Sequence, residues 1–219
     1  MKTGHILVEG QTEERFVKDV LGPYLLRELE LWLEPTVLTT SKGRTGKHNK
    51  GGAVDFERVE RSVRRLLGNS SATVVTTLLD YYGLGHWPGK ARSAQGAVDH
   101  AITLARALTD TVDDRRLLSF LAVHELEAYV FTDLEAAFAG RWPAQQIEQL
   151  RTDIRRQEPE AINDRPETTP GRRLARAFPG YRKALDTPTA LQAVTVPRIR
   201  DRCPHFSRWL TDLAAITRR

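Results

Sequence analysis

Three short apolar segments of this chain are each followed by acidic residues, and this repeated layout constrains the fold more than any other feature. The segments are residues 6–8, 72–79 and 117–123, and the acids that follow them are Glu9, Asp80, Glu125 and Glu127. Unbroken apolar runs of this kind are typical of strands that are buried on both faces of a sheet. Segments with helical periodicity separate them, and this alternation predicts a mostly parallel sheet flanked by helices, an α/β fold.

The remaining elements of the core follow from hydrophobic periodicity. We expect helices over residues 13–32, 54–67, 94–108 and 126–138, and one more strand over residues 35–39. Pro23 should kink or divide the first helix, because proline cannot donate the backbone hydrogen bond that a helix interior requires. The α/β core is therefore predicted to span residues 1–140.

The chain changes character after residue 140. Residues 141–219 contain helical patterns and no further strand signal, which predicts a C-terminal helical extension. Residues 1–140 carry 17 Lys and Arg against 19 Asp and Glu, whereas residues 141–219 carry 16 against 9. An acidic front half and a basic back half suit a carboxylate site that faces a polyanion such as nucleic acid. Scattered arginines on a solvated surface would produce the same asymmetry.

Composition excludes several classes of protein. The sequence has no run of 18 or more apolar residues, so we expect no membrane span. Its first residues lack the apolar region of a signal peptide. The single cysteine, Cys203, excludes an intrachain disulfide and a cysteine-based zinc site, and we expect it to have a packing role. These features predict a cytoplasmic protein.

The residues that follow the first strand predict a turn that aims carboxylates at the edge of the sheet. Gly10 permits a sharp turn, and Thr12 is predicted to cap the next helix. Glu13 would then lie in the first helical turn and reach back toward Glu9. Two carboxylates aimed at one point repel each other unless a cation or a proton lies between them. The alternative is that Glu13 and Glu14 only favour the start of the helix.

The full set of acids predicts a site for a hard metal ion. Its members are Glu9, Glu13, Asp80, Glu125 and Glu127. All of them lie at or just beyond the carboxyl ends of predicted strands, which meet at one edge of a parallel sheet. A group of carboxylates with no evident histidine or cysteine ligands favours Mg²⁺ or Mn²⁺. Such ions activate water and stabilise charge at phosphorus.

Aromatic and histidine side chains near these strands have less specific interpretations. Trp87 is predicted to pack its loop against the sheet, although aromatics beside a carboxylate site could also stack on bases. Trp32, Trp142 and Trp209 are expected in core or interdomain contacts. His124 is expected to be a structural hydrogen-bonding residue, with proton transfer as the alternative.

Five stretches of the chain carry a resemblance to a known family. They are residues 9–14 (EGQTEE), 79–84 (LDYYGL), 124–128 (HELEA), 162–168 (INDRPET) and 203–206 (CPHF). On these stretches, which extend over almost the full length, the chain resembles the TOPRIM-like family DUF4276, a domain of unknown function. The pattern of acids is similar to that of OLD-type nucleases, whose TOPRIM fold is shared with topoisomerases and DnaG-type primases.

This resemblance implies cleavage of nucleic-acid phosphodiesters, in DNA or RNA, with Mg²⁺ or Mn²⁺ as the cofactor. It also implies a role in bacterial anti-phage defence or mobile-element biology, beside a partner ATPase encoded nearby. Two alternatives remain open. The protein could be a non-catalytic, metal-binding interaction subunit of an ATPase-containing complex, or a phosphotransfer or nucleotidyl enzyme that acts on a small nucleotide.

The resemblance also assigns roles to single residues. The core metal ligands would be Glu9 and Asp80, and the residues that complete a second metal site or hold the general base would be Glu13, Glu125 and Glu127. OLD-type enzymes use a late lysine near the leaving group, for which Lys183 is the best match. TOPRIM proteins usually have Asp-x-Asp at the second motif, but here Tyr82 replaces the second Asp. The resemblance therefore leaves open whether the site holds one metal ion or two, and whether it cleaves.

Two basic segments are predicted to contact nucleic acid. The candidates are Lys47, His48 and Lys50 in a glycine-rich loop over residues 41–52, and Arg172, Arg173 and Arg176 in a short helix over residues 171–178. The loop lacks the Walker spacing of Gly, Lys and Ser/Thr, so we do not interpret it as a P-loop. Its basic side chains are still candidates for contact with phosphates. Both segments would neutralise backbone phosphates without reading bases.

Overall fold

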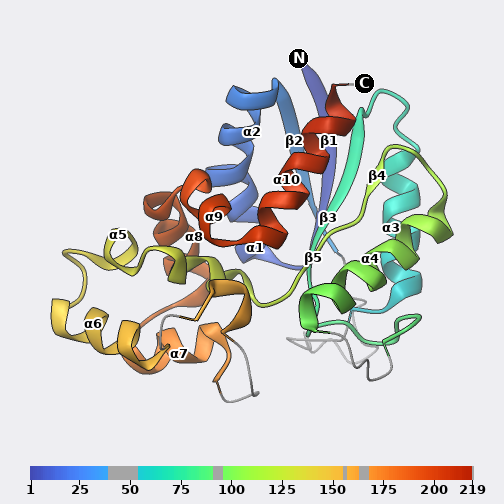
Figure 1. The fold of residues 1–219 in the computed structure, drawn as a ribbon. Helices are drawn as coiled ribbons and strands as arrows, with labels where there is room; N and C mark the ends of the chain where they lie inside the picture. Colours follow the sequence, from blue (N-terminus) through green and yellow to red (C-terminus); the bar gives the residue numbers. More distant parts are fainter. Residues whose placement is uncertain (39–53, 91–95, 155–156, 163–167, 219) are drawn as a thin grey trace, which may run out of the picture.

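A five-stranded parallel sheet forms the centre of the molecule (Figure 1). The computed structural model describes residues 1–38, 54–90, 96–154, 157–162 and 168–218. The strands are β1 (Lys2–Val8), β2 (Leu31–Val37), β3 (Val74–Asp80), β4 (Leu117–Leu118) and β5 (Leu121–Ala122). They pair in the order β2-β1-β3-β4, with β5 also on β3, and each of these pairings is parallel. The predicted α/β fold is confirmed.

Helices flank this sheet and form the whole C-terminal part that the structure describes. They are α1 (Gln11–Phe16), η1 (Val17–Leu21), α2 (Gly22–Leu29), α3 (Phe56–Leu67), α4 (Ala97–Val112), η2 (Leu126–Thr132), α5 (Leu134–Phe138), α6 (Ala144–Asp153), η3 (Pro159–Ala161), α7 (Pro170–Ala177), α8 (Lys183–Val194), α9 (Val196–Arg202) and α10 (Pro204–Thr217). Within the described residues, none of these helices has the length and apolar character needed to cross a membrane.

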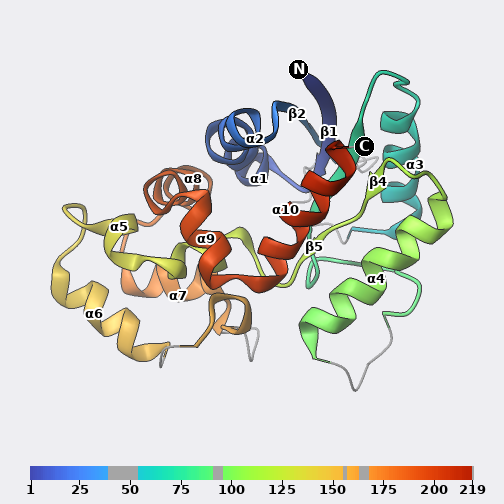
Figure 2. The same ribbon diagram turned by 45° about the horizontal axis from the view of Figure 1, so that its top comes forward.

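Alternate residues of the central strands supply two separate hydrophobic cores. Leu7 packs with α3 and α4 on one face of the sheet, whereas Ile6 and Val8 pack with α1, η1, α2 and α10 on the other (Figures 1 and 2). This alternation follows from the two-residue repeat of a strand. The core that contains Ile6 and Val8 also contains Trp209 and other residues from beyond residue 140. The helical C-terminal part and the sheet therefore share this core.

The first helix departs from its predicted course. It begins at Gln11 after an N-cap at Gly10, so the predicted Thr12 cap is wrong, although Glu13 remains in the first turn. Its predicted kink is a π-helical segment, η1, in which the N–H of Gly22 bonds to the Val17 carbonyl. This wider turn comes just before Pro23, which lacks the N–H of a normal helix interior.

The second strand begins earlier in the chain than predicted, because α2 ends at Leu29. Glu30 adopts a left-handed conformation with φ 53°, which stops the helix, and β2 begins at Leu31 instead of residue 35. Trp32 is therefore a strand residue and is 50% exposed, because its neighbours Leu31 and Leu33 face the core. Its predicted core position is wrong. Trp87 and Trp209 are buried, as is Cys203.

The third apolar segment is interrupted, and threonines on the neighbouring strand explain why. The hydroxyl of Thr77 donates to the carbonyl of Phe120 (2.7 Å) and accepts from its N–H (2.8 Å). The hydroxyl of Thr76 donates to the Leu118 carbonyl (2.6 Å). These side chains satisfy backbone groups that a ladder would otherwise pair. Residues 117–123 therefore form two short strands instead of one.

The segment after β5 also differs from the predicted helix over residues 126–138. It forms the 3₁₀ helix η2 and then the separate α-helix α5. Asp133 divides them, because its side chain accepts the N–H of Ala136 and so caps a new helix start. The 3₁₀ segment carries Glu127, one of the predicted site acids.

Candidate acidic site at the carboxyl edge of the sheet

The register of the strands brings the ends of β1, β3 and β5 to one edge. Val8 pairs with Leu78, and Asp80 pairs with Ala122. Glu9 directly follows β1, and its Oε2 accepts a long hydrogen bond from the Asp80 N–H (3.4 Å). Gly83 makes room for this contact, since a Cβ there would lie 3.2 Å from Glu9 Oε2. Glu9 and Asp80 therefore lie together at this edge of the sheet, as the sequence predicts.

Glu13 joins this group from the first turn of α1. Burial raises its pKa, the positive charge of Lys183 opposes that shift, and the negative charge of Glu9 adds to it. We refer to Glu9, Glu13 and Asp80 as the β1–β3 acids. In the part of the chain that the structure describes, no lysine or arginine lies within ion-pair distance of any of them.

Burial and mutual repulsion raise the pKa values of the β1–β3 acids, which means that their ionised forms are disfavoured. The pKa of Asp80 is raised to about 7, first by burial and then by the charges of Glu9 and Glu125. Burial also raises the pKa of Glu9, against a hydrogen bond from the Asp80 backbone. A shift in this direction means that burial and repulsion outweigh the groups that favour the ionised form, Lys183 among them. A proton or a cation would therefore stabilise this group.

Glu125 and Glu127, which we call the β5 acids, are compensated in part within the chain, although burial still raises the pKa of Glu127. Lys183 at the start of α8 lies 2.9 Å from Glu127 Oε2 and 3.8 Å from Glu125 Oε1. Glu127 is fully buried, and its Oε1 accepts from the hydroxyl of Thr187 (2.8 Å). Glu125 Oε2 accepts the N–H of Gly171 (3.0 Å). Burial lowers the pKa of Lys183, but the charges of Glu127 and Glu125 outweigh it and raise the pKa on balance.

The donor set of the β1–β3 acids fits a hard divalent cation in its chemistry. All three supply carboxylate oxygens, which Mg²⁺ and Mn²⁺ prefer, and Lys183 offsets their charge only in part. In residues 1–38, 54–90, 96–154, 157–162 and 168–218, no three acidic, histidine or cysteine side chains converge closely enough to hold a metal ion as they stand. The acids would have to close around an ion.

Tyr82, two residues after Asp80, is held by a hydrogen bond and a ring contact. Its N–H donates to Asp80 Oδ1 (2.9 Å), and its ring stacks on His124 with centroids 5.4 Å apart and planes 7° apart. His124 is buried, and burial lowers its pKa to about 4. A neutral imidazole at this position supports the predicted structural role better than proton transfer at neutral pH.

The two basic segments can be compared with the acids only in part. Lys47, His48 and Lys50 lie outside the described residues. Arg172, Arg173 and Arg176 lie on α7, whose second residue, Gly171, contacts Glu125. Arg173 Nε donates to the Thr168 carbonyl (2.8 Å), so this arginine also supports the start of the helix. The basic helix α7 is thereby tied to the acidic edge.

Three contributors to this region were not predicted. Gly171 and Thr187 hold the β5 acids, but a glycine after proline and a threonine in a helix carry no distinguishing pattern. Glu160 is also buried, and it accepts the N–H groups of His205 (2.9 Å) and Phe206 (3.0 Å) at the start of α10. Its place near the family-like stretch over residues 162–168 was the only available signal.

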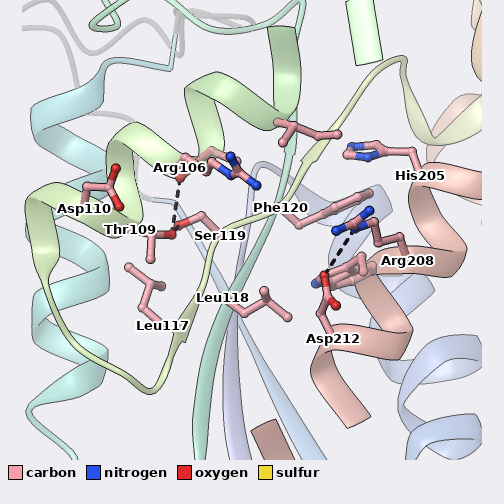
Figure 3. A pocket seen from close by; sticks show the side chains of 13 residues that line it. Arg106, Thr109, Asp110, Leu117, Leu118, Ser119, Phe120, His205, Arg208 and Asp212 are labelled. Atoms are coloured by element: carbon pink, nitrogen blue, oxygen red, sulfur yellow. Dashed lines mark hydrogen bonds and ion pairs between the residues drawn. The ribbon is translucent and has the colours of Figure 1, made fainter. Parts of the chain in front are cut away.

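A cavity of about 590 Å³ lies apart from the acids, between α4 and α10 over β4 (Figure 3). Its lining combines Arg106 and Asp110 of α4 with Arg208 and Asp212 of α10. Arg208 and Asp212 form a weak ion pair (3.9 Å) on the same helix. None of the five candidate acids lines this cavity, and its charges are balanced, so it is not part of the acidic site.

Comparison with known proteins leads to one family. A family model described as a domain of unknown function (DUF4276) matches residues 8–214 of the chain. No curated protein matches the chain, and no solved structure matches it.

Proposed function

The chain belongs to the DUF4276 family, and from the chemistry of its acidic edge we propose that it is a metal-dependent nuclease that hydrolyses phosphodiesters of DNA or RNA. The observation that carries this proposal is the set of β1–β3 acids, which are desolvated and lack a cationic partner within ion-pair distance among the described residues. The resemblance of the motifs to TOPRIM proteins and OLD-type nucleases supports the same reaction. It also supports a cytoplasmic role in bacterial defence, beside a partner ATPase.

Each acidic residue has a role in this proposal. Glu9 and Asp80 would hold Mg²⁺ or Mn²⁺, which when bound supplies charge stabilisation at phosphorus and lowers the pKa of water. Glu13 would take up the proton of the attacking water at its carboxylate, for which a raised pKa is suited. The water oxygen bonds to phosphorus as the bond to the leaving oxygen breaks.

The β5 acids would act through Lys183. Because they keep its ammonium protonated and fixed 2.9 Å from Glu127, Lys183 would stabilise the negative charge of the leaving oxygen instead of donating a proton. The arginines of α7, which is tied to Glu125, would neutralise the neighbouring backbone phosphates.

Isosteric substitution of the acids tests this function. Purified protein with Mg²⁺ or Mn²⁺ is incubated with single- and double-stranded DNA and RNA, and the products are resolved by gel. We expect Glu9→Gln and Asp80→Asn to lower the cleavage rate by about 100-fold or more. Glu14→Gln is the matched control, because Glu14 lies in the same helical turn but pairs with Lys18 at the surface (2.6 Å). Equal cleavage by Asp80→Asn and wild type would contradict the proposal.

A non-catalytic, metal-binding subunit of an ATPase complex is the second candidate. The observation that favours it is Tyr82, which removes one carboxylate from the second motif. In that case calorimetry should detect Mn²⁺ binding that Asp80→Asn abolishes, while no substrate is cleaved. Partner binding would survive in the same variant.

A further inference from the structure

We propose that Tyr82 is a stacking platform for an unpaired base, so that the acidic edge selects single-stranded over fully paired nucleic acid. This inference deepens the proposed function, because it names the substrate class of the same site. It rests on the position, the packing and the exposure of one aromatic ring.

The position of Tyr82 is set by the acid that precedes it. Asp80 ends β3, and its Oδ1 accepts the Tyr82 N–H (2.9 Å). This hydrogen bond from the backbone to the aspartate side chain forms an Asx-turn, which sets the direction of the backbone at Tyr82. A base that stacks on Tyr82 would therefore bring its own sugar and phosphate close to Asp80 and Glu9.

Two neighbouring rings pack against Tyr82. One face lies parallel to the imidazole of His124, with planes 7° apart. The ring also meets Tyr81 edge to face, with centroids 4.9 Å apart. Tyr81 is in turn fixed by a hydrogen bond between its hydroxyl and His100 Nδ1 (2.8 Å). A ring held by packed neighbours loses little conformational entropy when a ligand stacks on it.

Exposure shows that part of the ring is available. Tyr82 is 50% exposed, whereas His124 is 4% exposed. Near-parallel rings with centroids 5.4 Å apart overlap only in part, so His124 leaves part of the Tyr82 ring open to solvent. A base on the open part of the ring would extend the existing stack.

Only an unpaired base can stack on such a ring surface. In a duplex both faces of each base are covered by neighbouring base pairs, so stacking on a protein ring requires a single strand, an end or an extruded nucleotide. Base stacking on aromatic side chains is tolerant of sequence, because every base has a π-face. We therefore expect the site to prefer single strands over duplexes, without a strong preference for base sequence.

The test measures binding without relying on cleavage. A single-stranded DNA oligonucleotide with 2-aminopurine is titrated with protein in Ca²⁺, an ion that also takes carboxylate oxygens, and fluorescence reports stacking. We expect Tyr82→Ala to weaken binding about 10- to 100-fold and to remove the fluorescence change. Tyr82→Phe should stay within about threefold of wild type, because it keeps the ring. The duplex form should bind wild type more weakly than the single strand does.

Trp32→Ala is the matched control. Trp32 is also 50% exposed, but it lies near the amino ends of the strands, opposite Thr3, so its loss should change nothing. Wild-type affinity in a folded Tyr82→Ala variant, equal affinity of wild type for single strand and duplex, or no binding of the oligonucleotide would each overturn the platform. Cleavage that Tyr82→Ala retains with unchanged strand preference overturns the platform and leaves the nuclease. Stacking that depends on Tyr82 without cleavage in any metal supports the platform and overturns the nuclease.

Discussion

The two parts of the acidic edge contain the same chemical groups and balance their charge in different ways. The β5 acids have a resident cation, Lys183, together with the Gly171 N–H and the Thr187 hydroxyl. The β1–β3 acids have no cation within ion-pair distance in the described part of the chain, and the pKa of Asp80 is raised to about 7 by burial and by nearby carboxylates. The comparison teaches that one part has a cation in contact with it, which offsets burial only in part at Glu127, whereas the other has only the more distant charge of Lys183.

The largest expected effect is a dependence of stability on pH that originates in Asp80. Its pKa is about 7 in the folded state against an ordinary 3.8, so the folded state binds the proton more tightly than the unfolded state. The free energy of unfolding should therefore fall as pH rises from about 4 to about 7, by up to about 4 kcal/mol in EDTA. Urea unfolding at pH 5 and pH 8 measures this slope.

Asp80→Asn sharpens this prediction, because it removes the titrating group. The variant should lose the Asp80 part of the slope, while the other carboxyls whose pKa is raised, such as Glu9 and Glu13, leave a smaller slope of the same sign. Mn²⁺ at pH 8 should stabilise wild type but not the variant. Glu14→Gln should keep the wild-type slope, since Glu14 is paired with Lys18. If Asp80→Asn retains the full slope, the β1–β3 acids are not the less compensated part of the edge.

An intermediate effect is expected for Lys183→Met, which converts the compensated part into an uncompensated one. Glu127 is fully buried and would lose its cation, whereas the side chain of Lys183 is itself 47% exposed. Breaking a fully buried ion pair costs about 3–5 kcal/mol, so we expect a loss of about 2–3 kcal/mol in unfolding free energy at pH 7.

Two variants check the cause of that loss. Glu127→Gln in the Lys183→Met background should restore most of the stability, because no buried charge then remains. Lys18→Met removes a surface pair with Glu14 and should cost less than about 1 kcal/mol. A loss for Lys183→Met no larger than that for Lys18→Met would show that the buried charge of Glu127 is not what Lys183 compensates.

The sequence was sufficient for the parallel arrangement of the sheet and for the position of most acids, but not for the bounds of every strand. Parallel strands that are buried on both faces have few ways to pair, so the residues after β1, β3 and β5 had to meet at one edge. The predicted position of Glu13 near Glu9 followed from the same turn. These predictions used only patterns that are local along the chain.

The features that the sequence did not predict depend on contacts between distant residues. The break between β4 and β5 is made by the hydroxyls of Thr76 and Thr77, which belong to another strand. The π-helical turn before Pro23 and the left-handed Glu30 moved the second strand, and with it Trp32, away from their expected places. The contact of Lys183 with Glu127 was suggested only by resemblance, because no local pattern relates α8 to η2.

The smallest expected effect on stability is that of Gly171→Ala, and it tests how rigid the β5 acids are. A Cβ at this position would lie 2.6 Å from Glu125 Oε2, so the carboxylate must move and lose the Gly171 N–H. The obstructing atom is the end of a flexible side chain, and alanine is favoured over glycine within a helix by about 0.5–1 kcal/mol. We therefore expect the free energy of unfolding, measured in urea, to change by less than about 1 kcal/mol.

The same variant should disturb the site more than the fold. Glu125 would leave its place beside Lys183, and we expect the Mn²⁺ affinity measured by calorimetry to change less than in Asp80→Asn, because Glu125 belongs to the compensated part. Gly96→Ala is the control, since a Cβ there has no atom within 4 Å. A loss of several kcal/mol in Gly171→Ala would mean that Glu125 cannot rotate away. The β5 acids would then be a rigid support for Lys183, and an ion at this edge could recruit ligands only from the β1–β3 acids.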